Sequence, residues 1–235
     1  MLNNVIQQQI EYYRARANEY EQWFYRTGRY DRGEEINRRW FDEVAILKTA
    51  LHQIEPVEHI LELACGTGIW TQEILQIGQQ ITAIDAALEV IEINQQKLQS
   101  PHITYQQSDL FTWEPERQYD LVFFSFWLSH IPPIELSSFL QKVFRSVRNG
   151  GQIFIIDSLF EATSTAKNHI LKNDGSIYQM RKLNDGQEFQ IVKVFYQPDQ
   201  LKHLLRLAQF NAEVKVTENY FIYAHGQKIT SSLEP

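Results

Sequence analysis

The chain has 235 residues, of which 43% are hydrophobic and 22% are charged, with a formal net charge of −7. This length and composition fit one globular α/β domain with a small cap, and no apolar run is long enough to span a membrane. The acidic balance argues against nucleic acid as a partner, and a single cysteine with a polar, signal-free N-terminus predicts a cytoplasmic protein without disulfides.

The N-terminal region, residues 1–52, reads as a helical cap. Apolar side chains recur at steps of three and four residues, which is the period of a helix, at Ile6, Ile10, Tyr13, Ala17, Tyr20 and Phe24. The segment RTGRYDRG at 26–33 interrupts this pattern with two glycines, and a second helix is expected from Glu34 to Ile54.

From Val57 onward, short apolar strands alternate with helices. Strands are expected at 57–64, 79–85, 102–109, 119–126 and 152–158, and helices at 68–77, 87–99 and 132–151. Because strands that alternate with helices run parallel in one sheet, we predict a doubly wound α/β domain.

The C-terminal third of the chain does not continue this alternation of strands and helices. The turn Asn184-Asp185-Gly186 separates two strand-like runs, which predicts a hairpin. A helix over 197–210 and two antiparallel edge strands within 212–226 follow. We therefore assign the sheet domain to 53–158 and 198–230, a hairpin insert that contributes to an acceptor pocket to 159–197, and a flexible tail to 231–235.

The stretch LELACGTGIW at 61–70 is a glycine-rich turn between the first strand and its helix. Ligands of open α/β sheets bind at such turns, where helix N–H groups are free. A dinucleotide fold requires a third glycine where this chain has Thr71, and a phosphate-binding P-loop requires Gly-Lys-Ser/Thr, which is absent. Glu62, placed before the glycines, repels phosphate and attracts a cationic ligand.

At this point the sequence resembles the class I S-adenosylmethionine-dependent methyltransferases. Their first motif is an acid, one apolar residue and then Gly-x-Gly-x-Gly. Here Glu62, Ala64, Gly66 and Gly68 match it, with Ala64 in place of the first glycine. The resemblance implies S-adenosylmethionine as cofactor, no metal, and a Rossmann-like α/β/α sandwich whose seven-stranded sheet has an antiparallel last strand.

Further motifs follow in the order of the family. Asp85, followed by Ala86, ends the second strand, where the resemblance implies an acid that accepts bonds from both ribose hydroxyls. Asp109 and Leu110 follow the third strand and would hold adenine through the carboxylate and a backbone N–H. Ser125 ends the fourth strand, where the methyl group and its acceptor would meet.

The cap combines aromatic residues with arginines, so we expect some of them to bind ligand as well as pack. Tyr13 and Arg29 are candidates for the methionyl group of the cofactor, because a tyrosine or arginine can bind its carboxylate and an aromatic face can hold a cation. The residues predicted to wall the acceptor pocket are Tyr20, Trp23, Tyr30, Trp127 and Tyr196.

His130, just beyond the fourth strand, is the candidate general base, because histidine exchanges protons near neutral pH. It could equally cap the following turn or pack on adenine. Cys65 is interpreted as a small packing residue, since no histidine is adjacent in the sequence.

The predicted function is in-line transfer of a methyl group to an oxygen or nitrogen of a small, partly aromatic or apolar molecule. The motif Asn/Asp-Pro-Pro-Tyr of amino-group methylation is absent after the fourth strand, where the chain reads SFWL. Alternatives are a protein or RNA methyltransferase, a non-enzymatic S-adenosylmethionine-binding module and a nucleotide-dependent oxidoreductase. The protein is expected to be a monomer or a homodimer.

Overall fold

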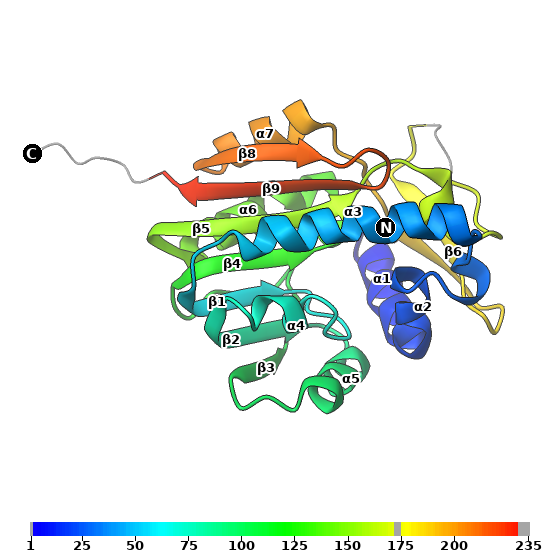
Figure 1. The fold of residues 1–235 in the computed structure, drawn as a ribbon, viewed down its shortest axis with the longest axis horizontal. Helices are drawn as coiled ribbons and strands as arrows, with labels where there is room; N and C mark the ends of the chain where they lie inside the picture. The colour runs from blue at the N-terminus through cyan, green and yellow to red at the C-terminus, as the bar shows by residue number, and fades with distance from the viewer. Residues whose placement is uncertain (1, 172–174, 230–235) are drawn as a thin grey trace, which may run out of the picture.

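The computed structural model describes residues 2–171 and 175–229, and the predicted 231–235 tail lies outside this part of the chain. One sheet has seven strands in the order β3-β2-β1-β4-β5-β9-β8 (Figure 1). In chain order the strands are β1 Val57–Leu63, β2 Gly78–Asp85, β3 Ile103–Gln107, β4 Tyr119–Ser125, β5 Val147–Ser158, β8 Phe210–Val216 and β9 Phe221–Lys228.

Strand β9 is the antiparallel strand that the sequence predicted. The five strands from β1 to β5 pair in parallel, whereas β9 runs antiparallel to β5 on one side and to β8 on the other. The two C-terminal strands therefore close one edge of the sheet, as expected. The carboxyl ends of β1, β2 and β4 consequently meet at the same edge, where a ligand site is predicted.

Helices cover both faces of the sheet, because successive strand residues point to opposite sides. In β4, Leu121 and Phe123 face the helices α3 Glu34–His52, α4 Thr71–Ile74 and α5 Leu88–Leu98. Val122 and Phe124 face α6 Pro133–Ser146 and α7 Pro198–Leu207. Full burial of side chains like these stabilises the fold by roughly 1.5–3 kcal/mol each, so the predicted three-layer arrangement has a core on each side.

The cap is more broken than its periodicity predicts. Helix α1 spans Leu2–Arg16, a 3-10 turn occupies Ala17–Glu19, α2 covers Tyr20–Phe24, and a second 3-10 turn covers Gly28–Tyr30. Figure 1 shows α1 and α2 beyond the carboxyl ends of the parallel strands. The break after Arg16 lets Glu19 reach Arg29 and the backbone N–H of Asn184, contacts that a continuous helix would not make.

The predicted hairpin is present as a separate two-stranded sheet, β6 Tyr178–Lys182 and β7 Glu188–Val192, with α1 packed against β7. The N–H of Leu183 donates to the carbonyl of Gln187, which leaves a three-residue loop, and Gly186 has the positive φ of 93° that such a loop requires.

The helix after the glycine turn is shorter than predicted, since α4 covers only four residues of the expected 68–77. The chain enters β2 already at Gly78, where a Cβ atom would lie 2.5 Å from Cδ1 of Ile60. After α4 the helical hydrogen-bond pattern is lost, because the N–H groups of Gln76 and Ile77 donate to the carbonyls of Glu73 and Ile74, three residues back. Within the described residues, no helix is both long and apolar enough to cross a membrane.

Candidate active site

The glycine turn after β1 contains three residues with positive φ: Ala64 at 56°, Gly66 at 53° and Gly68 at 87°. Ala64 thus occupies a left-handed conformation that favours glycine. Gly68 is needed for packing, because a Cβ atom there would lie 2.5 Å from Oδ1 of Asn94. A Cβ atom at Gly66 would meet nothing within 4 Å, which leaves the backbone of this residue open to a ligand.

A cavity of about 670 Å³, counted with the space open to solvent, lies over this turn. Its size is typical of small-molecule and cofactor sites. Most residues predicted to bind the cofactor line it: Tyr13, Ala64, Gly66, Asp85, Ala86, Asp109, Leu110 and Ser125. Helix α1 covers it with Gln9 and Ile10, neither of which was predicted from the sequence, although Ile10 follows the same helical period as Tyr13.

The carboxylate of Asp85, which lines the cavity, is hydrogen-bonded to the glycine turn. Its Oδ2 accepts a 2.9 Å hydrogen bond from the N–H of Gly66, and its Oδ1 accepts one of 3.0 Å from Ala87. Burial raises the pKa of Asp85, and these N–H donors oppose the rise. Each carboxylate oxygen keeps further acceptor capacity, which suits a pair of ribose hydroxyls. Asp109 accepts a bond from the N–H of Phe111 in the same way.

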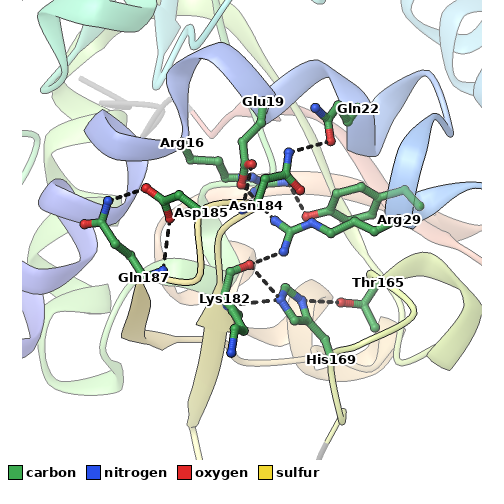
Figure 2. A network of polar contacts seen from close by, with 11 residues as sticks. Arg16, Glu19, Gln22, Arg29, Thr165, His169, Lys182, Asn184, Asp185 and Gln187 are labelled. Carbon is green, nitrogen blue, oxygen red and sulfur yellow. Dashed lines mark hydrogen bonds and ion pairs between the residues drawn. The ribbon is translucent and has the colours of Figure 1, made fainter.

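Three residues predicted to bind the cofactor lie outside the cavity lining. Glu62 is buried beneath the turn, where its Oε2 accepts a 2.7 Å bond from the hydroxyl of Thr71, and burial raises its pKa to about 8. Gly68 packs on Asn94. Arg29 bonds to Glu19 at 2.8 Å and to the carbonyl of Lys182, so it joins the cap to the hairpin (Figure 2).

A second cavity of about 600 Å³, again counted with open space, lies between the cap, the hairpin and the segment after β5. Tyr20, Trp23 and Tyr30, three of the residues predicted to wall the acceptor pocket, line it together with His130. Trp127 lines the cofactor cavity instead, where its ring packs 5.5 Å from that of Phe111. Tyr196 lines neither cavity. It follows β7 in the chain, and its side chain packs into the hydrophobic core under α6 and α7.

Three buried cationic side chains, which were not predicted from the sequence, also line the second cavity: Arg16, Arg181 and Lys193. They come from α1, β6 and the end of the hairpin. The available signal was the strand alternation, which buries Arg181 on β6 between exposed neighbours. The sequence shows this alternation but not that α1 and the hairpin face one cavity.

The partners of these cations differ. Lys193 donates to Oγ of Ser129 at 2.7 Å, to Oδ1 of Asp157 at 3.3 Å and to Oγ of Ser158 at 3.2 Å. Arg16 donates to the hydroxyl of Tyr30, and Arg181 to the carbonyl of Met180. Among the described residues, no carboxylate forms an ion pair with either guanidinium.

His130 is held in one tautomer. Its Nδ1 lies 2.7 Å from the carbonyl oxygen of Val192, which can only accept, so Nδ1 carries the proton. Its Nε2 lies 2.8 Å from the hydroxyl of Tyr13 and is the acceptor there. Burial, together with the nearby Lys193 ammonium, holds the pKa of His130 well below its usual value. The ring is therefore neutral at physiological pH.

The two cavities share a wall made of Tyr13, Tyr20 and Phe126. Phe126 follows β4 with a φ of 53°, which is rare for a bulky residue and concentrates backbone strain at this junction. A group passing from one cavity to the other would cross this wall. The site thus has two chambers that meet where the predicted methyl transfer would take place.

Comparison with known proteins identifies the family to which the chain belongs. Residues 60–151 match the family model described as methyltransferase domain. The structure of DhpI in complex with SAH is 30% identical in sequence and has a TM-score of 0.78, and the match covers 96% of this chain and 97% of that chain. A DhpI-SAM-HEP complex has the same identity and TM-score, and its match covers 94% of this chain and 97% of that chain. Ubiquinone biosynthesis O-methyltransferase of Pseudomonas fluorescens (strain Pf0-1) is 28% identical over 194 residues, 74% of this chain and 79% of that protein.

The first cavity fits S-adenosylmethionine, because Asp85 and Asp109 offer carboxylate acceptors at the ends of two strands and the apolar Leu110 lines the same cavity. The structural neighbours bind SAH or SAM, and within the described residues no group of three His, Cys, Asp or Glu could hold a metal. S-adenosylmethionine is the cofactor, and the chain belongs to the class I S-adenosylmethionine-dependent methyltransferases.

Proposed function

We propose that this enzyme methylates an oxygen of a small anionic acceptor bound in the second cavity. The observation that carries the proposal is the pair of buried guanidinium groups, Arg16 and Arg181, which face that cavity without an acidic partner among the described residues. The sequence favoured a partly aromatic or apolar acceptor. The aromatic walls support that expectation for part of the molecule, whereas the charges favour an anionic group.

Electrostatics supports an anion. Three cationic side chains face the cavity, and Asp157 is the buried carboxylate that pairs with one of them, Lys193. Burying a charge without a partner costs several kcal/mol, roughly, even after relaxation, and burial accordingly lowers the pKa of Arg181, which has no acidic partner among the described residues. A bound carboxylate, phosphate or phosphonate would offset this cost, and the planar guanidinium groups suit such oxyanions.

The geometry suits a displacement that needs no strong base. The cofactor supplies a methyl group made electrophilic by its sulfonium. Tyr13, Tyr20 and Phe126 line both cavities and place apolar and aromatic surface at the junction. Arg16 and Arg181 would orient the acceptor for in-line attack, which is the main contribution required of the protein. An ionised oxygen carries no proton to remove, which agrees with a neutral His130 of low pKa.

The relatives support oxygen as the accepting atom. Similar proteins from several Pseudomonas strains are named ubiquinone biosynthesis O-methyltransferase. A malonyl-[acyl-carrier protein] O-methyltransferase of Ilyobacter polytropus matches over 97 residues. The DhpI-SAM-HEP complex contains HEP as well as SAM, so a neighbour with this fold binds a further ligand together with the cofactor.

The test is calorimetric titration of inorganic phosphate and of acetate into the protein saturated with SAH. We expect anion binding that is weakened about tenfold or more in Arg16→Met and in Arg181→Met, as for hydrogen bonds to charged groups, with an unchanged Kd for SAH. Arg14→Met is the matched control, since Arg14 lies on the same helix and is exposed. A screen of small carboxylates, phosphates and neutral phenols as methyl acceptors, in which SAH release measures turnover, then identifies the acceptor. Turnover with neutral phenols alone would contradict the proposal.

A further inference from the structure

Tyr13 stands at the junction of the two cavities. It belongs to α1, and it is one of the three residues that line both the cofactor cavity and the acceptor cavity. Among these three, Tyr13 is the one whose hydroxyl has a hydrogen bond to a side chain with a defined tautomer. Its protonation and orientation can therefore be worked out from the neighbouring atoms.

The direction of the bond between Tyr13 and His130 follows from the carbonyl of Val192. Because Nδ1 of His130 must donate to this carbonyl, Nε2 of the neutral ring has no hydrogen. The hydroxyl of Tyr13 is then the donor in the 2.8 Å contact with Nε2. Burial raises the pKa of Tyr13 well above its usual value, so the hydroxyl keeps its proton.

Other contacts hold this arrangement in place. Gln9, one turn before Tyr13 on α1, donates from Nε2 to the carbonyl of His130 at 3.0 Å, and its Oε1 accepts from the N–H of Val192 at 3.1 Å. The ring of Tyr13 meets the imidazole edge-on with centroids 5.5 Å apart. Helix α1, the turn that contains His130 and strand β7 are thereby fixed to one another.

We propose that Tyr13 is a catalytic residue whose oxygen offers only lone pairs to the junction and contacts the electropositive S-methyl group there, and that His130 is the positioning residue that enforces this. A tyrosine hydroxyl has one donor and two acceptor sites, and His130 takes the donor. A C–H next to a cationic sulfur is a favourable partner for an oxygen lone pair. The inference rests on the assignment of the cofactor and is independent of the charge of the acceptor.

The first test compares the Kd for S-adenosylmethionine with the Kd for SAH, which lacks the methyl group and the positive charge. In Tyr13→Phe we expect the Kd for S-adenosylmethionine to rise about two- to fivefold, as for weak hydrogen bonds, with an unchanged Kd for SAH. Tyr25→Phe is the control, because Tyr25 is an exposed tyrosine of the same cap outside both cavities. An equal change for both ligands, or no change for either, would overturn the proposal.

The second test reads His130 directly by nitrogen NMR of histidine-labelled protein. We expect the Nδ1-protonated neutral tautomer, without titration between about pH 6 and 8. His130→Ala should lose the preference for S-adenosylmethionine as Tyr13→Phe does, and His130→Gln should restore part of it, since its Oε1 can accept the hydroxyl proton. An Nε2-protonated ring, or a His130→Ala variant with the full preference, would refute the positioning role. If anion binding at Arg181 fails, the Kd preference for S-adenosylmethionine over SAH and the NMR tautomer of His130 should both stay as expected here.

Discussion

The hydroxyl of Thr71 donates a 2.7 Å hydrogen bond to Oε2 of Glu62, and both side chains are buried beneath the glycine turn. The same hydroxyl accepts from Nδ2 of Asn94 at 2.9 Å, and this Nδ2 also lies 3.3 Å from the carbonyl of Gly66. The acid before the glycines and the threonine in place of a third glycine thus form one network that supports the turn from below.

This network predicts how stability depends on pH. Burial raises the pKa of Glu62 in the folded protein to about 8, above its value of 4.5 without such burial. Between these values the folded chain binds a proton that the unfolded chain has released, so stability falls as pH rises, by up to about 1.4 kcal/mol per pH unit. Below this range Glu62 is protonated in both states and its burial no longer lowers stability as a buried charge. Above this range Glu62 is ionised in both states, so stability no longer changes with pH through this residue.

Urea unfolding of the ligand-free protein at several pH values from about 5 to 8 measures this slope, with Glu62→Gln as the comparison. The variant keeps an acceptor for Thr71 and cannot ionise, so its stability should fall less steeply with pH than that of the wild type. Parallel profiles for the two proteins would show that Glu62 does not carry the effect.

The backbone of the glycine turn predicts opposite effects at neighbouring positions. Ala64→Gly should stabilise the protein by roughly 0.5–1 kcal/mol, because relief of the left-handed strain exceeds the entropy that glycine adds to the unfolded chain. Gly66→Ala should cost about 1–2 kcal/mol from backbone strain alone. Gly68→Ala should cost more than either, because its Cβ would also clash with Asn94. Thermal and urea unfolding of the three variants would rank them, and equal stability of Gly66→Ala and Gly68→Ala would contradict the clash.

Asp85 is predicted to bind the cofactor with both carboxylate oxygens. In Asp85→Asn one oxygen becomes an NH₂ group, which would face the N–H of Gly66 or of Ala87. Loss of charged hydrogen bonds typically costs about 1.5–3 kcal/mol, so we expect the Kd for SAH to rise roughly tenfold or more. Calorimetry with Asp120→Asn as a control, a strand acid far from the cavity that pairs with Arg148, checks this. An unchanged Kd for Asp85→Asn would remove Asp85 from the site.

Most residues that line the first cavity were predictable from the sequence, and so were three aromatic residues of the second cavity, whereas the three cations of the second cavity were not. Asp85 and Asp109 stand directly after parallel strands, and the carboxyl ends of such strands meet at one edge. Arg16, Arg181 and Lys193 meet only because α1 packs on β7, a contact between segments that are far apart in the chain. The directions of two side chains were equally inaccessible: Glu62, near the end of β1, points to Thr71 beneath the glycine turn, and Tyr196 points into the core.

Arg29 provides a direct test of this difference between sequence and structure. The sequence predicted a contact with the cofactor, whereas the structure shows Arg29 bonded to Glu19 and to the carbonyl of Lys182, in the network that joins cap and hairpin (Figure 2). The side chains of Arg29 and Glu19 are only 12% and 11% exposed. Removing one partner of such a pair leaves a largely buried charge, so Arg29→Met should destabilise the protein by roughly 1–3 kcal/mol.

Urea unfolding and SAH titration of the same Arg29→Met sample separate the two roles. Arg39→Met is the matched control: its ion pair with Glu35 is exposed, and such pairs contribute about 0–1 kcal/mol. Loss of stability in Arg29→Met with an unchanged Kd for SAH would establish Arg29 as the anchor between cap and hairpin. Normal stability with weakened SAH binding would instead support the cofactor role that the sequence predicted, and it would require the cap to adopt another arrangement when the cofactor binds.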